Sequence, residues 1–189
     1  MLVCTVTLKG TTPYSQSRVL QTQRQPGESA DVHDQRCWRE HIHADDNGVF
    51  IPPMAIKNCL ADVARYLGES VPGKGKSTYT KHFEAGTLVV DPIYLGIKQD
   101  KIQGERIYVS SDGKKNGSSK VWRTYPVIPP GWTGEAKIIL LDPILIDKPD
   151  KVKQYLEQAG RFIGIGRFRP RNGGYYGRFE VVKFEVGKA

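Results

Sequence analysis

Hydrophobic and polar residues alternate near both ends of the chain. In residues 2–9, apolar side chains occupy every second position, and residues 176–186 follow the same alternation. A period of two is typical of a strand that buries one face. We therefore predict a first strand at residues 2–9 and a last strand at residues 176–186. The buried face of the first strand would carry Leu2, Cys4, Val6 and Leu8.

Two other segments carry apolar residues at helical spacing. Residues 52–69 begin with two prolines, which suit the first turn of a helix, and Gly68 supplies a C-terminal stop. Residues 148–160 form the second predicted helix, with Asp147 as its N-cap. The apolar faces would consist of Ile56, Leu60, Val63 and Leu67 in the first helix, and of Val152, Tyr155, Leu156 and Ala159 in the second.

Further extended segments lie between these elements. Residues 37–52 are typical of a hairpin, because Asn47-Gly48 readily adopts the positive φ angles of a tight turn. Residues 87–97 and 135–146 are predicted strands. Residues from about 98 to 133 are predicted to form an inserted hairpin around the glycine-rich sequence SDGKKNGSS.

The order of these elements predicts the fold class. Without the insertion, it is the βαββαβ pattern of a ferredoxin-like (RRM-like) α+β fold, with two helices on one face of a four-stranded antiparallel sheet. A chain of 189 residues is long enough for one such core. We therefore expect a single ferredoxin-like domain over residues 1–189. A mobile loop is predicted at residues 11–34, which are polar and aperiodic, in addition to the inserted hairpin at about 98–133.

The positive charge of the chain is concentrated in its later part. The net charge is +8, but residues 1–70 hold seven Lys and Arg against eight Asp and Glu, which leaves 21 against 12 in the rest. A clustered surplus of this kind favours a polyanionic partner.

Cysteine use and hydropathy indicate the compartment. The three cysteines are widely spaced and form no CxxC pair, which argues for reduced thiols. No apolar stretch approaches a bilayer span, and the first residues lack the pattern of a signal peptide. We therefore expect a cytoplasmic protein without a membrane partner.

The strongest functional signal is the sequence GIGRFRPRNGGYYGRFEV, residues 164–181. It contains four arginines and no acidic residue before Glu180. Glycines let a backbone approach a phosphate, arginines bind phosphate through a planar fork of donors, and exposed rings stack on unpaired bases. We therefore predict a site for single-stranded nucleic acid. The alternative is a glycine-rich connection packed against the second helix, with solvated arginines. The predicted phosphate contacts are Arg167, Arg169, Arg171 and Arg178, and the predicted stacking residues are Tyr175 and Tyr176.

Two segments of the chain resemble a known family. The sequence GRFIGIGRFRPRNGGYYGRFEV is similar to the glycine-rich signature of the repeat-associated mysterious protein (RAMP) superfamily, and GVFIPPMAIKNCLADVARYL resembles the segment in which those proteins enter their first helix. The resemblance implies a ferredoxin-like RNA-binding subunit of a CRISPR effector complex. Its implied partners are single-stranded RNA, either guide or target, and protein subunits of a CRISPR-type ribonucleoprotein or copies of this chain.

The chain also departs from that family. Backbone subunits usually carry Gly-Ser-Ser after the proline and a more basic helix, whereas this chain has Pro53-Met54-Ala55 and Asp62, and it is short for a full backbone subunit. These departures leave open a divergent relative, or a phage-encoded mimic or inhibitor that docks on CRISPR effector subunits or competes for guide RNA.

A basic loop follows the first predicted helix. Gly75-Lys76-Ser77 matches the end of a P-loop, but Ser70 stands where the first glycine would be, and a helix precedes the loop instead of a strand. We therefore expect no nucleotide cofactor. The loop is predicted instead to extend the RNA site through Lys74, Lys76 and Lys81, and a solvated loop is the alternative.

Histidines and aspartates cluster before the first helix. His41 and His43 would share one strand face, as metal ligands sometimes do, but aspartate pairs are also common in turns. We predict no metal site. The enzymatic alternative is a metal-independent endoribonuclease that uses His33, His41 or His43 for acid–base chemistry. The potential ligands or acid–base groups are Asp31, His33, Asp34, His41, His43, Asp45 and Asp46.

The three tryptophans could either stack bases or pack within the protein. Large rings bury much area and fit naturally on strands. We therefore predict core or hairpin packing for Trp38, Trp122 and Trp132.

Overall fold

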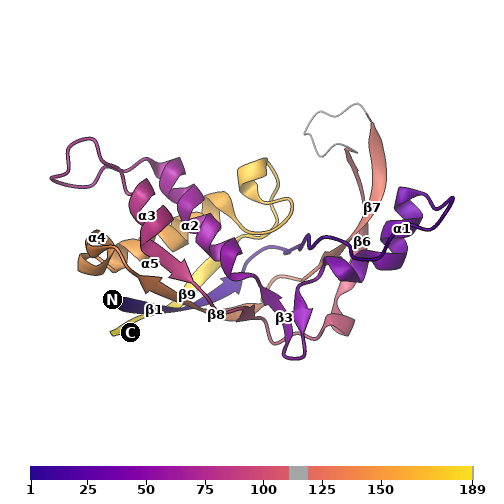
Figure 1. The fold of residues 1–189 in the computed structure, drawn as a ribbon, viewed down its shortest axis with the longest axis horizontal. Coiled ribbons are helices and arrows are strands. Elements are labelled where there is room, and N and C mark those ends of the chain that lie inside the picture. Colours follow the sequence, from indigo (N-terminus) through magenta and orange to yellow (C-terminus); the bar gives the residue numbers. More distant parts are fainter. Residues whose placement is uncertain (111–118, 189) are drawn as a thin grey trace.

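A four-stranded antiparallel sheet forms one part of the molecule in the computed structural model, which describes residues 1–110 and 119–188 (Figure 1). Its strand order is β4-β8-β1-β9. Leu2 of β1 lies opposite Lys188 of β9, so the two ends of the chain are neighbours. The strands are β4 (Thr87–Val89), β8 (Thr133–Leu140), β1 (Leu2–Gly10) and β9 (Phe179–Lys188).

Helices cover one face of this sheet. α2 (Pro53–Leu67), α3 (Thr80–Gly86) and α5 (Asp150–Gln158) lie together above the strands (Figure 1). Burying one aliphatic side chain of such a core stabilises the fold by about 1.5–3 kcal/mol. The buried side chains include Cys4, Val6 and Leu8 from β1, Ile56, Leu60 and Val63 from α2, and Val152, Tyr155 and Leu156 from α5.

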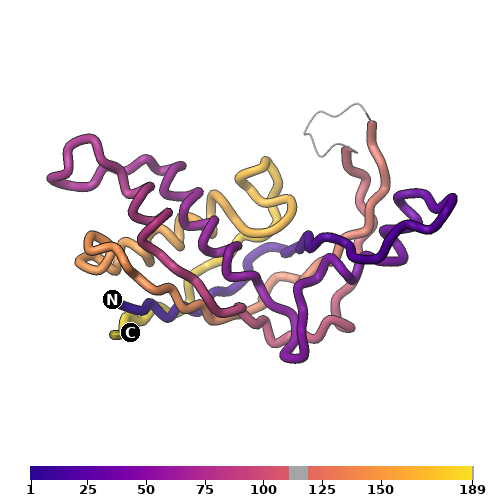
Figure 2. Tube along the Cα trace, in the orientation of Figure 1, coloured from indigo at the N-terminus to yellow at the C-terminus, as the bar shows by residue number. Residues whose placement is uncertain are grey.

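A long hairpin extends at the other end of the molecule from the termini (Figures 1 and 2). Its strands, β6 (Gln103–Ser110) and β7 (Lys120–Val127), pair in antiparallel fashion. Helix α1 (Ala30–Cys37) packs against β7. A small sheet in the order β2-β3-β5 completes the set, with β2 at Ala44–Asp45, β3 at Gly48–Ile51 and β5 at Ile93–Tyr94.

Short helical turns connect these elements. They comprise α4 (Pro143–Asp147), the 3₁₀ turns Trp38–His41, Gln99–Lys101 and Pro170–Asn172, and a π-helical turn at Ala159–Ile163. None of the helices in the described ranges is long and apolar enough to cross a membrane.

The mixed α+β class with antiparallel strands agrees with the sequence prediction. The predicted first and last strands correspond to β1 and β9, and the predicted helix over residues 52–69 corresponds to α2, which ends at Gly68 in a left-handed conformation. β6 and β7 lie within the range predicted for the inserted hairpin. Most of the glycine-rich sequence between them, residues 111–118, lies outside the described part of the chain.

The strand predicted over residues 135–146 is too long. β8 ends at Leu140, and the remainder forms α4, because Pro143 occupies a first-turn position and an Asp142 carboxylate oxygen accepts a hydrogen bond from the Ile144 amide at 2.9 Å. Asp147 is consequently the last residue of α4 and not the N-cap of the next helix, which begins at Asp150 after Pro149.

Residues 11–34 contain more structure than the predicted mobile loop. Ser29 caps α1 by accepting a hydrogen bond from the Val32 amide at 3.3 Å, so a helix begins inside this range. The beginning of the segment is packed as well, since Tyr14, Ser15 and Gln16 are buried. Only the middle of the segment remains a solvated connection.

Two further predictions need correction at their boundaries. The hairpin predicted over residues 37–52 is shorter, because Trp38–His41 is a 3₁₀ turn. Its turn is also displaced by one residue. Asp45 pairs with Gly48, so the turn is Asp46-Asn47 and not Asn47-Gly48. The strand predicted over residues 87–97 is divided between two sheets, β4 and β5, on either side of Pro92. Helix α3 was not predicted, since its sequence reads as part of the basic connector.

Candidate nucleic-acid interface

The glycine-rich loop, defined here as residues 164–178, is a tightly folded structure. A Cβ atom at Gly177 would lie 1.9 Å from the Ile165 carbonyl oxygen, and one at Gly166 would lie 2.3 Å from the Ser15 carbonyl oxygen. Both glycines also have positive φ angles, 71° and 72°. The glycines are therefore required by contacts of the chain with itself.

Backbone hydrogen bonds fix the loop to the segment that follows β1. The Arg167 amide donates to the Ser15 carbonyl at 2.9 Å, and the Gly177 amide donates to the Pro13 carbonyl at 2.7 Å. The Ile165 amide donates to Gly177 across the base of the loop at 3.0 Å. The side chains that the loop presents are thus held in position before any ligand arrives.

The four predicted arginines have different surroundings. Arg171 is exposed on the turn Pro170–Asn172. Arg169 lies 3.4 Å from a carboxylate oxygen of Asp62 on α2. The Arg178 guanidinium donates to backbone carbonyls, that of Arg161 at 3.1 Å and that of Tyr175 at 3.4 Å, so it supports the loop while remaining partly exposed.

Arg167 points toward the hairpin. Its guanidinium carbon lies 3.9 Å from the centre of the Tyr125 ring on β7, in a cation–π contact. Burial is the main cause that lowers the pKa of Arg167, because a low-dielectric environment disfavours its charged form. Its Nε has no hydrogen-bond partner among the described residues.

The two adjacent tyrosines are not equivalent. Tyr175 is 58% exposed, and its ring meets the Tyr176 ring edge to face at 4.8 Å. Tyr176 is only 6% exposed, and its hydroxyl donates to Glu105 at 3.3 Å. Burial also raises the pKa of Tyr176. The stacking role predicted for Tyr176 does not fit this burial, whereas Tyr175 offers an accessible ring.

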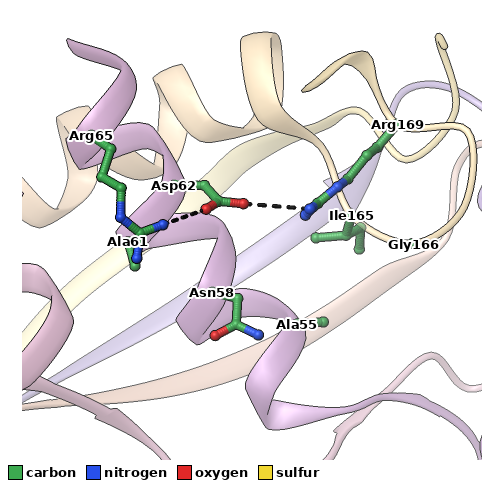
Figure 3. A pocket seen from close by; sticks show the side chains of 8 residues that line it. All are labelled: Ala55, Asn58, Ala61, Asp62, Arg65, Ile165, Gly166 and Arg169. Carbon is green, nitrogen blue, oxygen red and sulfur yellow. Dashed lines mark hydrogen bonds and ion pairs between the residues drawn. The ribbon is translucent and has the colours of Figure 1, made fainter. Parts of the chain in front are cut away.

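A cavity of about 340 Å³ lies between α2 and the glycine-rich loop (Figure 3). Asp62 stands between two guanidinium groups there, contacting Arg65 at 2.8 Å and Arg169 at 3.4 Å (Figure 3). Arg65 also contacts Glu84 at 2.6 Å. The charges around this cavity are therefore balanced in the free protein.

A pair of exposed rings lies on the hairpin. Tyr108 and Trp122 are cross-strand neighbours with ring centres 5.0 Å apart, and they are 52% and 44% exposed. The Arg106 guanidinium lies 4.8 Å from the centre of the Trp122 ring. Trp122 thus packs within the hairpin as predicted while presenting a surface to solvent, and Trp38 and Trp132 are buried. Alternating aromatics on two strands are the sequence signal for this pair.

The basic loop lies apart from the glycine-rich loop. Lys74, Lys76 and Lys81 are exposed. Lys74 and Lys76 lie in the segment that follows α2 and extends to the left in Figures 1 and 2, and Lys81 lies on α3, whereas the glycine-rich loop, in yellow, lies on the other side of α2. The structure does not bring these lysines into one surface with Arg167 and Arg171.

The three histidines of the enzymatic alternative are separated as well. His33 Nε2 donates to the Thr22 carbonyl at 2.8 Å, and His41 Nδ1 donates to the Arg18 carbonyl at 2.7 Å. Burial lowers the pKa of His43, which lies beside Phe50. His41 belongs to a 3₁₀ turn, so the predicted shared strand face with His43 is wrong.

The aspartates near these histidines take part in structural contacts. Asp34 forms an ion pair with Arg123 at 2.9 Å, Asp31 pairs with Arg106, and Asp45 accepts a hydrogen bond from the Tyr94 hydroxyl at 2.7 Å. Asp46 is exposed in its turn. Within the ranges that the structure describes, no three His, Cys, Asp or Glu side chains are grouped so as to hold a metal ion.

Comparison with known proteins supplies a structural neighbour. No protein-family model matches the chain, and no curated protein matches its sequence. Its fold is similar to that of a chain in a cryo-EM structure of the Type III-B Cmr-beta bound to cognate target RNA, with a TM-score of 0.50 and 16% sequence identity. The match covers 99% of this chain and 61% of that chain, so this chain spans less than two thirds of its neighbour. At this identity the likeness concerns the fold alone.

Proposed function

We propose that the protein binds single-stranded RNA through the glycine-rich loop. The observation that carries the proposal is that a loop fixed by its own backbone presents an exposed cation, Arg171, and an exposed ring, Tyr175. A positive charge and a flat ring held on one loop suit a phosphate and an unpaired base. Arg169 and Arg178 lie on the same loop and would add phosphate contacts, and the rings of Tyr108 and Trp122 would extend the surface.

The proposal extends to a ribonucleoprotein of the CRISPR type. It is supported by the RAMP-like sequence segments and by the fold similarity to a chain from an RNA-bound Cmr complex. We propose a ferredoxin-like core, since β1, α2, β4, β8, α5 and β9 follow the βαββαβ order and the sheet order is β4-β8-β1-β9. The proposed partners are guide or target RNA and protein subunits or copies of this chain, in the cytoplasm.

Salt-dependent RNA binding tests this proposal. A fluorescein-labelled oligouridine decamer would be titrated with the protein between 50 and 300 mM KCl, with anisotropy as the readout. We expect affinity to fall with salt, and Arg171→Ala to weaken binding and reduce the salt slope by about 0.7. Lys153→Ala, an exposed cation on α5, is the matched control. The proposal is contradicted if the wild-type protein, Arg171→Ala and Lys153→Ala bind the decamer with equal affinity and equal salt slope.

One observation favours endoribonuclease activity as a second candidate. His41 shares a cavity with Arg123 and Arg167, so an imidazole lies near two guanidinium groups that could hold a phosphate. Incubation of the labelled decamer with the protein, with and without EDTA, would show metal-independent cleavage products if this candidate holds. His41→Ala would then abolish cleavage, whereas an intact decamer after prolonged incubation would exclude it.

A further inference from the structure

A polar cavity of about 270 Å³ lies where four segments of the chain meet. Its lining comes from α1 and the following 3₁₀ turn (Asp34, His41), from β6 (Val109, Ser110), from β7 (Arg123, Tyr125) and from the glycine-rich loop (Arg167). The cavity therefore joins the glycine-rich loop to the β6–β7 hairpin. Both of these regions present exposed aromatic rings.

The charges around this cavity are not balanced. Arg123 is neutralised by Asp34, whose carboxylate is buried and lies 2.9 Å from the guanidinium. Arg167 makes no ion pair with any residue in the described ranges. Arg167 is therefore the one arginine on the described lining that has no carboxylate partner.

Arg167 also lacks a hydrogen-bond acceptor. Its Nε is buried without a partner among the described residues, although one face of its guanidinium is covered by the Tyr125 ring at 3.9 Å. Arg167 is partly buried, and a low-dielectric surrounding without a counter-ion disfavours a positive charge. An anion that entered the cavity would supply both the missing charge and the missing acceptor.

The other two arginine-bearing cavities differ in this respect. The cavity beside α2 contains Arg65 and Arg169, and the carboxylates of Asp62 and Glu84 contact these two groups. The cavity beside β9 is lined by two arginines and two glutamates, which are Arg161, Arg178, Glu157 and Glu180. Among these three cavities, the one at Arg167 is where an anion would meet a surplus of positive charge on the described residues.

We infer that this cavity binds an internal phosphodiester of the RNA strand, between the guanidinium groups of Arg167 and Arg123. The inference rests on the proposed RNA-binding function and adds the position of one phosphate. A phosphodiester carries one negative charge, which matches the single surplus charge of the lining. A terminal phosphomonoester carries nearly two and would leave one uncompensated. A strand seated here would run from the glycine-rich loop to the hairpin.

Nuclear magnetic resonance of the intact protein tests the site directly. The dinucleoside monophosphate UpU has one phosphodiester and no terminal phosphate, and uridine has none. In protein labelled with ¹⁵N, we expect UpU to shift the Arg167 Nε–H resonance and uridine to leave it unchanged. If UpU moves the Arg171 resonance alone, or if both ligands move Arg167 equally, the inferred site is wrong.

Affinity measurements separate the failure of this site from the failure of the proposed function. We expect Arg167→Met, which keeps contact with Tyr125, to weaken binding of the oligouridine decamer about 10-fold, since a charged hydrogen bond is lost. Arg167→Lys should retain part of the affinity. A 5′-phosphate on the decamer should have no effect.

Three outcomes can be distinguished. If the decamer binds but Arg167→Met leaves its affinity unchanged while the thermal midpoint stays at the wild-type value, the phosphate lies elsewhere and only the inference fails. If Arg167→Met lowers the thermal midpoint, its affinity no longer tests the site. The inference then stands if UpU shifts the Arg167 Nε–H resonance of the wild-type protein, and fails if it does not. If neither UpU nor the decamer binds the wild-type protein, the proposed function fails together with the inference.

Discussion

Nη2 of Arg169 lies 3.4 Å from Oδ2 of Asp62, so the glycine-rich loop is tied to helix α2 by an ion pair (Figure 3). An RNA phosphate that approached Arg169 would compete with this carboxylate. Asp62 is also one of the residues in which α2 departs from the more basic helix of RAMP backbone subunits. If the loop binds RNA as proposed, this ion pair should lower the affinity of this part of the loop for RNA.

Asp62→Asn should accordingly strengthen RNA binding. A partly exposed ion pair contributes about 0.2–1 kcal/mol, so we expect a gain of roughly 1.5-fold to 5-fold in affinity for the oligouridine decamer at 100 mM KCl. Asp147→Asn, on the exposed end of α4, controls for the change in net charge. The interpretation is wrong if the two variants gain equally or if Asp62→Asn binds more weakly.

The tyrosine pair should separate binding from stability. Tyr175→Ala removes an exposed ring and should weaken RNA binding by about 1–3 kcal/mol if a base stacks there, with little change in thermal midpoint. Tyr176→Ala removes a buried ring and should destabilise the protein by about 3–5 kcal/mol. Tyr176→Phe keeps the ring and loses only the hydrogen bond to Glu105, which costs about 1 kcal/mol.

Thermal melts and anisotropy titrations on the same samples measure both effects. The decisive result is a loss of affinity without a loss of stability in Tyr175→Ala, because a general loss of fold would lower both the affinity and the thermal midpoint. A Tyr175→Ala variant with normal affinity would mean that no base stacks on the glycine-rich loop.

Sequence periodicity predicted the elements whose buried face is determined locally. The alternation around Cys4 and Val6 was sufficient to predict β1, and the apolar face of residues 52–69 was sufficient to predict α2. Each of these elements buries a regular stripe of side chains. The junction at Asp142-Pro143 was missed, since an apolar strand there continues into an apolar helix without a change in composition. The helix is defined by a capping hydrogen bond rather than by polarity.

The sequence could indicate which residue types the candidate site contains, but not which of their side chains are exposed or lie together. Tyr175 and Tyr176 are indistinguishable in sequence, and the contact that places Tyr176 against the hairpin is with Glu105, which is 71 residues away. The cavity at Arg167 depends on Asp34 and Arg123, which are far from the loop in sequence. Contacts of this range leave no local pattern in the sequence.

The close packing of the glycine-rich loop predicts a large cost for Gly177→Ala. The added Cβ would lie 1.9 Å from the Ile165 carbonyl oxygen, at a residue with φ of 71°. Gly73→Ala is the matched control, because its φ is 74° and nothing lies within 4 Å of the added atom. Both variants pay the backbone strain, about 1 kcal/mol. The clash should make Gly177→Ala less stable by at least another 1–3 kcal/mol in chemical denaturation, and equal losses would contradict a tight loop.

Glu40 should make stability depend on acid pH. Hydrogen bonds from the Thr22 hydroxyl and from the amides of Thr22 and Gln21 lower the pKa of Glu40 from 4.5 to about 2. Because the folded pKa lies below the unfolded one, this contribution is complete above about pH 4.5 and is lost as pH falls toward 2. Glu40→Gln should therefore flatten the decrease in thermal midpoint over that window. The assignment is wrong if the two proteins show the same pH profile.

The hairpin rings should extend the RNA surface beyond the glycine-rich loop. Tyr108 and Trp122 lie side by side with more than two fifths of each exposed, and Arg106 covers the Trp122 ring at 4.8 Å. A base stacked on such a platform contributes about 1–3 kcal/mol, so Trp122→Ala should weaken binding of a decamer while leaving a trimer that occupies only the glycine-rich loop unaffected. Val182→Ala, an exposed apolar residue on β9, is the control for lost surface area. If Trp122→Ala weakens the trimer and the decamer by the same factor, the rings act through the stability of the hairpin and not through a stacked base.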